Sequence, residues 1–293
     1  MPDVNTVYAI KFKNDFILRV QQKGSRLEMS VRDDPDFLEG KYGYYDRIGP
    51  VAGQTKSTRH GDTPINPSNY DRRRLLRDTK NWGDMVDRSD IARMMKNPTS
   101  RLVEGARMWR NRTVDDYVIT AATGPAWNID QDDNSTQVAF PNGNIIGQGG
   151  GAGLTLDKVL NAQELLDHAE VDDEEERYFV YTAHQMRQLL QSTPTTSEYF
   201  ADIEQIKAGK VDYLAKFRFI RSERLGMDPA ATTYRQNLAY AKRGIGAAPQ
   251  KEPFTRVTER DDKQYNWQAY IEFEIGATRI EDECVYAVDC LEP

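Results

Sequence analysis

The sequence predicts an α+β protein in which a long helix, separate loops and an antiparallel sheet follow one another. Three segments support this class. Residues 98–123 have the spacing of a long helix, residues 265–275 alternate like one strand, and residues 39–84 show neither a helical period nor a long apolar run. With 293 residues, the chain is expected to form two domains or one elaborate domain.

The composition excludes several classes of protein. No stretch approaches about 18 consecutive apolar residues, so no membrane-spanning helix is expected. Residues 1–5 lack the basic and apolar regions of a signal peptide, and two Cys cannot build a disulfide scaffold. Hydrophobic residues make up only 39% of the chain and aromatic residues 10%. This balance favours a soluble, folded chain that completes its folding against copies of itself.

The charge is unevenly distributed. Residues 59–112 contain thirteen Lys and Arg and seven acidic residues, a local net charge of +6 in a chain whose net charge is −7. A basic segment inside an acidic chain indicates either an anionic partner or pairing between copies.

The first 84 residues lack the pattern of an independent core. Residues 1 to about 35 predict an arm with one strand, because Leu27, Met29 and Val31 alternate with polar residues. Residues 39–84 are rich in Gly, Pro, Asn, Asp and Tyr. An unstructured loop of this length is improbable in a compact domain, so we expect a long two-stranded excursion. An isolated hairpin is only marginally stable in water, and a neighbouring chain is its natural support.

The long helix follows. An N-cap and proline at 97–99 begin it, and Gly124-Pro125 ends it. A shorter helix is expected at 89–96. Apolar residues recur along the long helix at spacings of three and four, and they predict the buried stripe Leu102, Ala106, Trp109, Thr113 and Tyr117.

The second half alternates helices and strands. Thr155 is the expected cap of a second helix, residues 178–181 read as a strand, and residues 184–191 as a short helix. Residues 265–275 place apolar side chains at every second position, which predicts a strand with one buried face. Residues 284–291 are apolar on both sides, as in a central strand.

No catalytic motif is found. His60, His168 and His184 lack a second histidine at metal-ligand spacing. Cys284 and Cys290 are six residues apart. On one extended strand their Cα atoms would be about 20 Å apart, too far for a disulfide, so buried free thiols are expected. We therefore expect no cofactor, no metal and no enzymatic activity.

Three further segments have both a functional and a structural interpretation. The glycine-rich run 147–153 lacks the ending of a phosphate-binding loop, and a plain loop is favoured. The acidic runs 130–133 and 170–176 lack calcium-loop spacing, and a solvated face is favoured over a cation site or a metal-dependent hydrolase. Residues 72–74 are three arginines that can bind phosphates or pair with carboxylates. The net charge of −7 of the whole chain favours pairing with carboxylates.

Several stretches, taken in order, resemble the major capsid proteins of tailed bacteriophages, which have the Hong Kong 97-like fold. They are RHGDTP (59–64), RR (72–73), VDRSD (86–90), ARMWR (106–110), DDYVITAATG (115–124), GLTLDK (153–158), RYFVYT (177–182), GKV (209–211), KFRF (216–219), IGATR (275–279) and CVYAV (284–288). The resemblance covers nearly the whole chain. Lys216 is a departure, since many relatives have glycine there.

The resemblance implies four parts. They are an N-terminal arm (1–35), an extended hairpin loop (36–84), a peripheral domain (85–174 and 256–293, with its spine helix at about 98–123) and an axial domain (175–255). It also implies pentamers and hexamers that close into an icosahedral shell around packaged double-stranded DNA, assembled in the host cytoplasm and located in the virion. Portal, scaffolding or decoration proteins would be further partners, and no membrane is implied. An encapsulin-like compartment is the alternative. The isopeptide cross-link of the founding member is not carried over, because its Lys, Asn and Glu are not identified here.

Two groups of residues are predicted to make the contacts between subunits and the core of the spine helix. Contacts between subunits are expected from the basic, aromatic loop, namely Tyr42, Tyr44, Tyr45, Arg59, Arg72, Arg73, Arg74 and Arg77. The core of the spine helix is expected from Leu102, Ala106, Trp109 and Tyr117.

Overall fold

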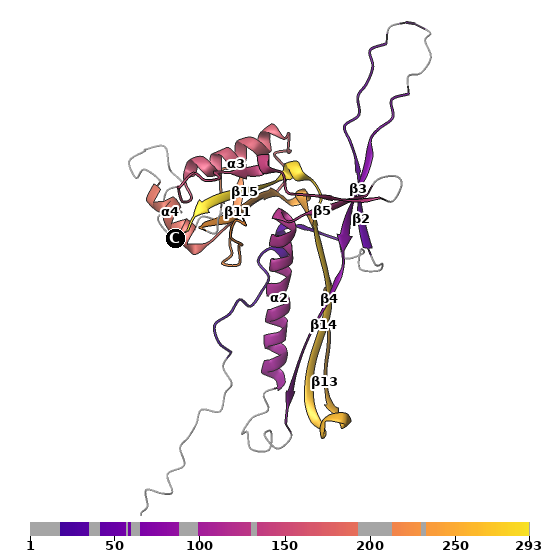
Figure 1. Ribbon diagram of the computed structural model, residues 1–293, viewed down its shortest axis with the longest axis vertical. Helices are drawn as coiled ribbons and strands as arrows, with labels where there is room; N and C mark the ends of the chain where they lie inside the picture. Colours follow the sequence, from indigo (N-terminus) through magenta and orange to yellow (C-terminus); the bar gives the residue numbers. More distant parts are fainter. Residues whose placement is uncertain are drawn as a thin grey trace, which may run out of the picture.

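A computed structural model describes residues 18–34, 42–56, 58–59, 65–87, 99–129, 134–192, 213–229 and 233–292. Within them the α-helices are α2 (Thr99–Thr123), α3 (Leu156–His168) and α4 (Ala183–Ser192). Figure 1 shows α2 beside a long sheet, with α3 and α4 over a second sheet. The α+β class is confirmed. The expected helix at 89–96 lies outside the described residues.

The described strands form three sheets. The first contains β1 (Arg32–Asp33), β12 (Ile245–Pro249), β14 (Asn266–Arg279), β13 (Phe254–Arg260) and β4 (Asp78–Val86). The second contains β7 (Ile145–Ile146), β15 (Val285–Leu291), β11 (Tyr234–Ala241), β8 (Arg177–Tyr181), β10 (Phe217–Arg221) and β9 (Tyr213–Leu214). The third contains β2 (Tyr42–Ile48), β3 (Tyr70–Leu76), β5 (Ala126–Ile129) and β6 (Ser135–Val138).

Strand β14 is the long central strand of the first sheet. It pairs with β4 along one edge and with β13 and then β12 along the other. Its side chains alternate as predicted from Ala269 to Ile275, with Ala269, Ile271, Phe273 and Ile275 buried, whereas Tyr265 precedes the strand and is exposed. The buried face packs on α2 (Figure 1). The predicted excursion therefore supplies a strand to the main body, because β4 includes its last residues, 78–84.

The buried face of α2 is wider than the predicted stripe. Val114, Val118 and Ala122 are fully buried, whereas Trp109 and Tyr117 are half-buried at the edge of a cluster around Phe273. Leu102 is also half-buried, and Ala106 is buried. The reason is that α2 is covered twice, by β14 on one side and by the N-terminal segment and second sheet on the other.

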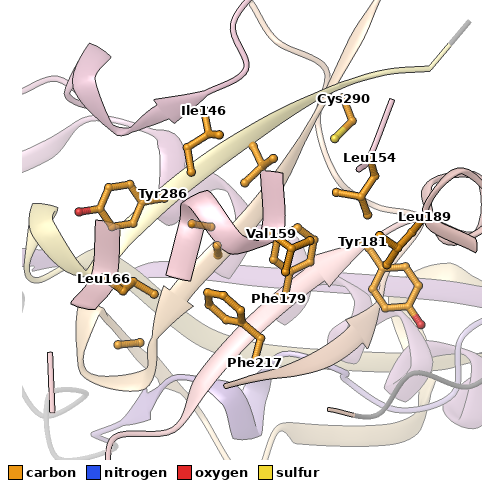
Figure 2. Packing of buried hydrophobic residues seen from close by; sticks show 14 of the residues in the cluster. Ile146, Leu154, Val159, Leu166, Phe179, Tyr181, Leu189, Phe217, Tyr286 and Cys290 are labelled. Carbon is orange, nitrogen blue, oxygen red and sulfur yellow. The ribbon is translucent and has the colours of Figure 1, made fainter. Parts of the chain in front are cut away.

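The second sheet holds the largest hydrophobic cluster. Strand β15 lies between β7 and β11 and is buried almost throughout, which confirms the predicted central strand. All five residues of β8 are buried. Figure 2 shows Val159 and Leu166 of α3 meeting Phe179 and Phe217 of the sheet. Helix α3 packs on the sheet that contains β8 and β11, and β15 pairs within that sheet. The predicted division instead assigns α3 and β15 to the peripheral domain and β8 and β11 to the axial domain.

Several local predictions for this half are also confirmed. Thr155 caps α3 by accepting a hydrogen bond from the backbone N–H of Lys158. Cys284 and Cys290 are free and buried, and burial raises the pKa of each thiol to about 12. Both thiols therefore remain protonated and unreactive at neutral pH.

The N-terminal segment differs from its prediction. Leu27 and Val31 are buried but Met29 is 86% exposed, because residues Glu28–Ser30 form a 3-10 turn rather than a strand. Pairing begins only at β1, which runs parallel to β12. The expected strand over 27–31 is thus wrong, because the turn exposes Met29 while Leu27 and Val31, which flank it, are buried.

One buried carboxylate fastens this segment to the spine helix. Asp115 of α2 is fully buried and accepts hydrogen bonds from the Ser25 hydroxyl at 2.6 Å and from the backbone N–H groups of Arg26 and Leu27 at 3.1 Å. The Gln22 side-chain amide donates to it as well, at 2.5 Å. These donors satisfy the charge that burial would otherwise destabilise.

The turn between β9 and β10 forms without glycine. Ala215 and Lys216 both have positive φ, 50° and 63°, in a two-residue hairpin turn. Lys216 is held there because its ammonium group pairs with Asp173 at 2.6 Å and with Asp167 at 3.5 Å. The acidic run 170–176 is therefore only partly a solvated face, since Asp173 pairs with Lys216 and Glu176 pairs with Lys242 at 3.0 Å.

Replacing Asp115 with Asn should lower the free energy of unfolding by about 3 kcal/mol, because an amide NH₂ would face N–H donors. Urea unfolding measures the loss, and limited proteolysis at 18–34 should accelerate. The neighbouring Asp116, which pairs with Arg224 at a partly exposed site, offers the control. Asp116→Asn should cost less than about 1 kcal/mol. Equal losses in the two variants would contradict the anchoring role of Asp115.

Ala215→Gly should raise the free energy of unfolding by about 0.5–1 kcal/mol, because relief of the left-handed strain exceeds the added entropy of the unfolded chain. Ala183→Gly, at the exposed first residue of α4, has no left-handed strain to relieve and should not raise it. Urea unfolding of both variants provides the measurement, and a loss of stability at position 215 would be the contrary result.

Candidate intersubunit surfaces

The predicted excursion is a hairpin that projects from the body. Strands β2 and β3 pair antiparallel from Tyr42↔Leu76 to Ile48↔Tyr70. The two arms continue beyond the strands, joined by a hydrogen bond from Gly49 N to Asn69 O at 2.8 Å. Figure 1 shows this distal part extending well away from the sheets. The two-stranded excursion is confirmed for residues 42–49 and 69–76, where the two arms pair.

The base of the hairpin sits on two glycines of the first sheet. Tyr45 of β2 and Leu75 of β3 are buried, at 4% and 0% exposure. Tyr45 lies against Gly246 of β12, and Leu75 lies against Gly276 of β14. A Cβ atom at Gly246 would overlap the Tyr45 ring, and one at Gly276 would overlap Leu75 and the Leu76 carbonyl. The backbone of the sheet is thus the surface on which the hairpin rests.

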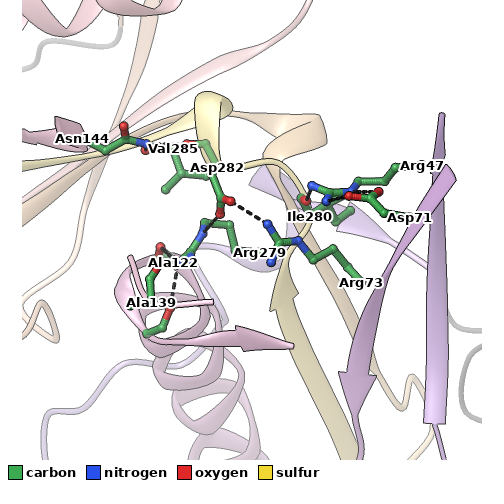
Figure 3. Close-up of polar contacts among 11 residues, drawn as sticks. Arg47, Asp71, Arg73, Ala122, Ala139, Asn144, Arg279, Ile280, Asp282 and Val285 are labelled. Atoms are coloured by element: carbon green, nitrogen blue, oxygen red, sulfur yellow. Dashed lines mark hydrogen bonds and ion pairs between the residues drawn. The ribbon is translucent and has the colours of Figure 1, made fainter. Parts of the chain in front are cut away.

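The contact of Tyr45 and Leu75 with Gly246 and Gly276 is called the seat of the hairpin below. A buried network of arginines and one carboxylate stabilises this seat (Figure 3). Asp282 accepts a 2.5 Å bond from Arg73 of β3 and another 2.5 Å bond from Arg279 of β14. Arg279 is fully buried and also donates to the carbonyls of Ala122 at 3.1 Å and Gly124 at 2.7 Å. It therefore caps the C-terminal end of α2, where a cation complements the helix dipole.

A second pair strengthens the same junction. Arg47 of β2 pairs with Asp71 of β3 and donates to the carbonyl of Ile280 at 2.7 Å. The hairpin is consequently bonded to the segment after β14 through both of its strands. Figure 3 shows Arg47 and Asp71 beside Ile280, and Arg73 aimed at Asp282.

Aromatic rings support the remaining arginines. The Arg74 guanidinium lies 4.9 Å from the Tyr42 ring centroid and 5.0 Å from that of Trp127 on β5. Arg72 lies 5.9 Å from the Tyr44 ring and pairs with Asp46 at 2.6 Å. These contacts give both cations favourable interactions inside one chain. The carboxylate interpretation of residues 72–74 therefore holds for Arg72 and Arg73.

The structure corrects two of the predicted contact residues. Tyr45 and Arg73 are buried against their own chain, and in this conformation they cannot face a neighbour. They hold the hairpin in place instead. Arg77 is also engaged within the chain, pairing with Glu274 at 3.1 Å. Tyr44, Arg59 and Arg72 are exposed. Their role between subunits stays a prediction, as does that of Tyr42 and Arg74.

Residues of the seat could not be singled out from the sequence. Gly246 and Gly276 lie in ordinary strands, and only the approach of the hairpin shows why no side chain fits there. Arg279 and Asp282 are three residues apart, a spacing found in many surface pairs. Nothing in the sequence marks Arg279 as the cap of a helix that ends 156 residues earlier.

The distal half of the hairpin carries apolar side chains without a packing partner among the described residues. The exposed ones are Ile48, Val51, Ile65 and Tyr70. Ile65 is 90% exposed, which is unusual for a large aliphatic side chain. The base of the hairpin is thus fixed, while its end offers apolar surface away from the body.

Within the described part of the chain, no three His, Cys, Asp or Glu side chains are gathered as metal ligands would be. None of the described helices is long and apolar enough to cross a membrane.

Comparison with known proteins decides the family. The family of phage capsid proteins matches residues 4–292. The chain belongs to the phage capsid protein family. No curated protein sequence matches this capsid protein. Family membership makes it a structural component of the virion capsid, a non-enzymatic major capsid protein, and does not favour the encapsulin alternative.

Solved capsid structures share the fold of this capsid protein. The capsid of cyanophage P-SCSP1u superposes with a TM-score of 0.75 at 15% identity, over 97% of this chain and 93% of that one. The capsid of Ralstonia phage GP4 has a TM-score of 0.71 at 10% identity, over 98% and 96%. The capsid of cyanophage Pam1 has a TM-score of 0.70 at 12% identity, over 99% of both chains. The expected Hong Kong 97-like fold is confirmed.

Gly276→Ala should lower the free energy of unfolding by about 2 kcal/mol, because the new methyl group overlaps Leu75 and the backbone of β3. Hydrogen exchange in β2 and β3 should accelerate more than in β8. Gly53 is the control, since nothing lies within 4 Å of a Cβ added there. If Gly53→Ala and Gly276→Ala unfold alike, the hairpin does not rest on Gly276.

Proposed function

We propose that this capsid protein forms pentamers and hexamers that close into an icosahedral shell around packaged double-stranded DNA. The observation that carries the proposal is the division of the hairpin into a locked base and an exposed apolar end. An apolar end held far from its own core is stabilised when another subunit covers it. A locked base would present that end to the neighbour at a constant angle.

We propose four parts for each subunit, following the predicted division. The arm (1–35) and the extended loop (36–84) would reach neighbouring copies. The peripheral domain would contain α2 and the first sheet, and we include in it β1 of the arm, β4 of the loop and β12 of the predicted axial range, because they pair in that sheet. The axial domain would contain the second sheet, and we include α3 and β15 in it because both pack there.

We propose that the basic segment 59–112 mainly makes contacts between subunits, and that contact with packaged DNA is its secondary role. Several of its arginines are paired with carboxylates of the same chain, which leaves less charge for phosphates. DNA contact would then be non-specific and weakened by salt. Portal, scaffolding or decoration proteins remain proposed partners, and assembly would take place in the host cytoplasm.

Replacing Ile48, Val51 and Ile65 together with Ser tests the role of the hairpin end. Each side chain is exposed in the single chain, so the free energy of unfolding should change by less than about 1 kcal/mol. Losing three buried contacts between copies should weaken subunit association about a hundredfold or more. Shell yield is measured by sedimentation and electron microscopy.

Leu160→Ser, at an exposed apolar position of α3, serves as the control and should assemble normally. Normal shells from the triple variant would reject the role of the hairpin end. Discrete monomers from the unaltered protein, under conditions that assemble other capsid proteins, would reject shell formation itself.

A further inference from the structure

Two aspartates meet in the interior of the second sheet. Asp289 of β15 is paired in register with Gln236 of β11. The segment before β11 turns back along the same strand, with Gln236 N donating to Gly226 O at 3.1 Å and Asp228 N donating to Tyr234 O at 2.8 Å. This arrangement brings Asp228, Gln236 and Asp289 together from three neighbouring stretches of backbone.

Both aspartates are withdrawn from water. Asp289 is 0% exposed and Asp228 is 4% exposed. Gln236 and Asp228 are close enough to act on the Asp289 carboxyl group. Neither oxygen of Asp289, however, has a hydrogen bond of ordinary geometry among the described residues. A buried carboxylate without donors is strongly disfavoured, whereas a protonated carboxyl group is tolerated.

The nearby cations are engaged elsewhere. The Lys158 ammonium of α3 donates to the backbone carbonyl of Asp289 at 2.6 Å and to that of Ala152 at 2.9 Å. Arg235 of β11 pairs with Glu292 at 2.7 Å and donates to Leu225 O at 2.6 Å. Lys158 therefore offsets part of the negative charge, but no cation pairs directly with the Asp289 side chain among the described residues.

We propose that Asp289 carries a proton where it faces Asp228 inside the second sheet, and that this proton is a lock holding the segment 226–229 on that sheet. With the proton present, the Asp289 carboxyl group donates to the Asp228 carboxylate, and the two groups do not repel each other. When the proton is released to solvent, two buried carboxylates repel each other and the segment separates more readily from β11 and β15.

The titration of Asp289 gives the direction of the effect. Burial, followed by the negative charge of Asp228, raises the pKa of Asp289 from 3.8 to about 6, while Gln236 and Lys158 oppose the increase. A pKa that is higher in the folded chain means that the stabilisation is complete below about pH 4. It is lost as the pH rises through about 6. A pH between 4 and 7 is thus the range in which the lock opens.

Hydrogen exchange read by mass spectrometry on full-length assembled protein tests this lock between pH 4 and pH 7. Asp289→Asn keeps the shape of the side chain but is neutral at every pH. After correction for intrinsic exchange, the opening constant of peptides covering 226–236 and 285–291 should rise with pH in the unaltered protein. Relative to Asp289→Asn the rise should reach up to about a hundredfold. Asp172→Asn, at an exposed position, is the control and should behave like the unaltered protein.

Parallel pH profiles for the unaltered protein and Asp289→Asn would overturn the proposal. If Asp289→Asn does not fold, Asp228→Asn replaces it in the same measurement. Removing the charge of Asp228 lowers the repulsion, so the rise in opening should shift to lower pH or disappear. An unchanged profile in Asp228→Asn would equally overturn the role of Asp228 in the lock.

Discussion

The buried guanidinium of Arg279 is the constraint on which the rest of the architecture depends. Arg279 is the last residue of β14. Its guanidinium donates to carbonyls at the end of α2 and, through Asp282, is linked to the hairpin strand β3. A fully buried arginine is costly unless its donors are satisfied, and here carbonyls and a carboxylate satisfy them. Because the same cation serves three elements, their mutual orientation is determined at one point. The hairpin, the spine helix and the first sheet therefore behave as one rigid junction.

The elements that the sequence predicts correctly are those determined by the residues of a single short segment. The alternation along β14, the cap at Thr155 and the two-sided burial of β15 are all properties of short segments. The resemblance to phage capsid proteins rested on the order of such segments, and the family match confirms it. The hairpin was predicted for a different reason, since a long segment without a core pattern needs support from outside.

The remaining features depend on contacts between segments far apart in the chain. The predicted stripe on α2 is too narrow, because a second side of the helix packs against residues around Leu27. The alternation of residues 27–31 predicts a strand, but Leu27 and Val31 are instead the buried flanks of a 3-10 turn that exposes Met29. Tyr45 and Arg73 belong to a basic, aromatic segment that looks exposed, and only their contacts with Gly246 and Asp282 explain why they are buried.

The glycine seat separates the direction of the hairpin from its length. Direction is determined at Gly246 and Gly276, by contact with the backbone of the sheet. Beyond Ile48 and Tyr70 the two arms make no described contact with the body, and lengthening a surface loop costs little free energy. Insertions and deletions at the tip are therefore tolerated by the subunit itself. The tip can diverge in size and sequence to suit shells of different curvature, while the fold that carries it stays the same.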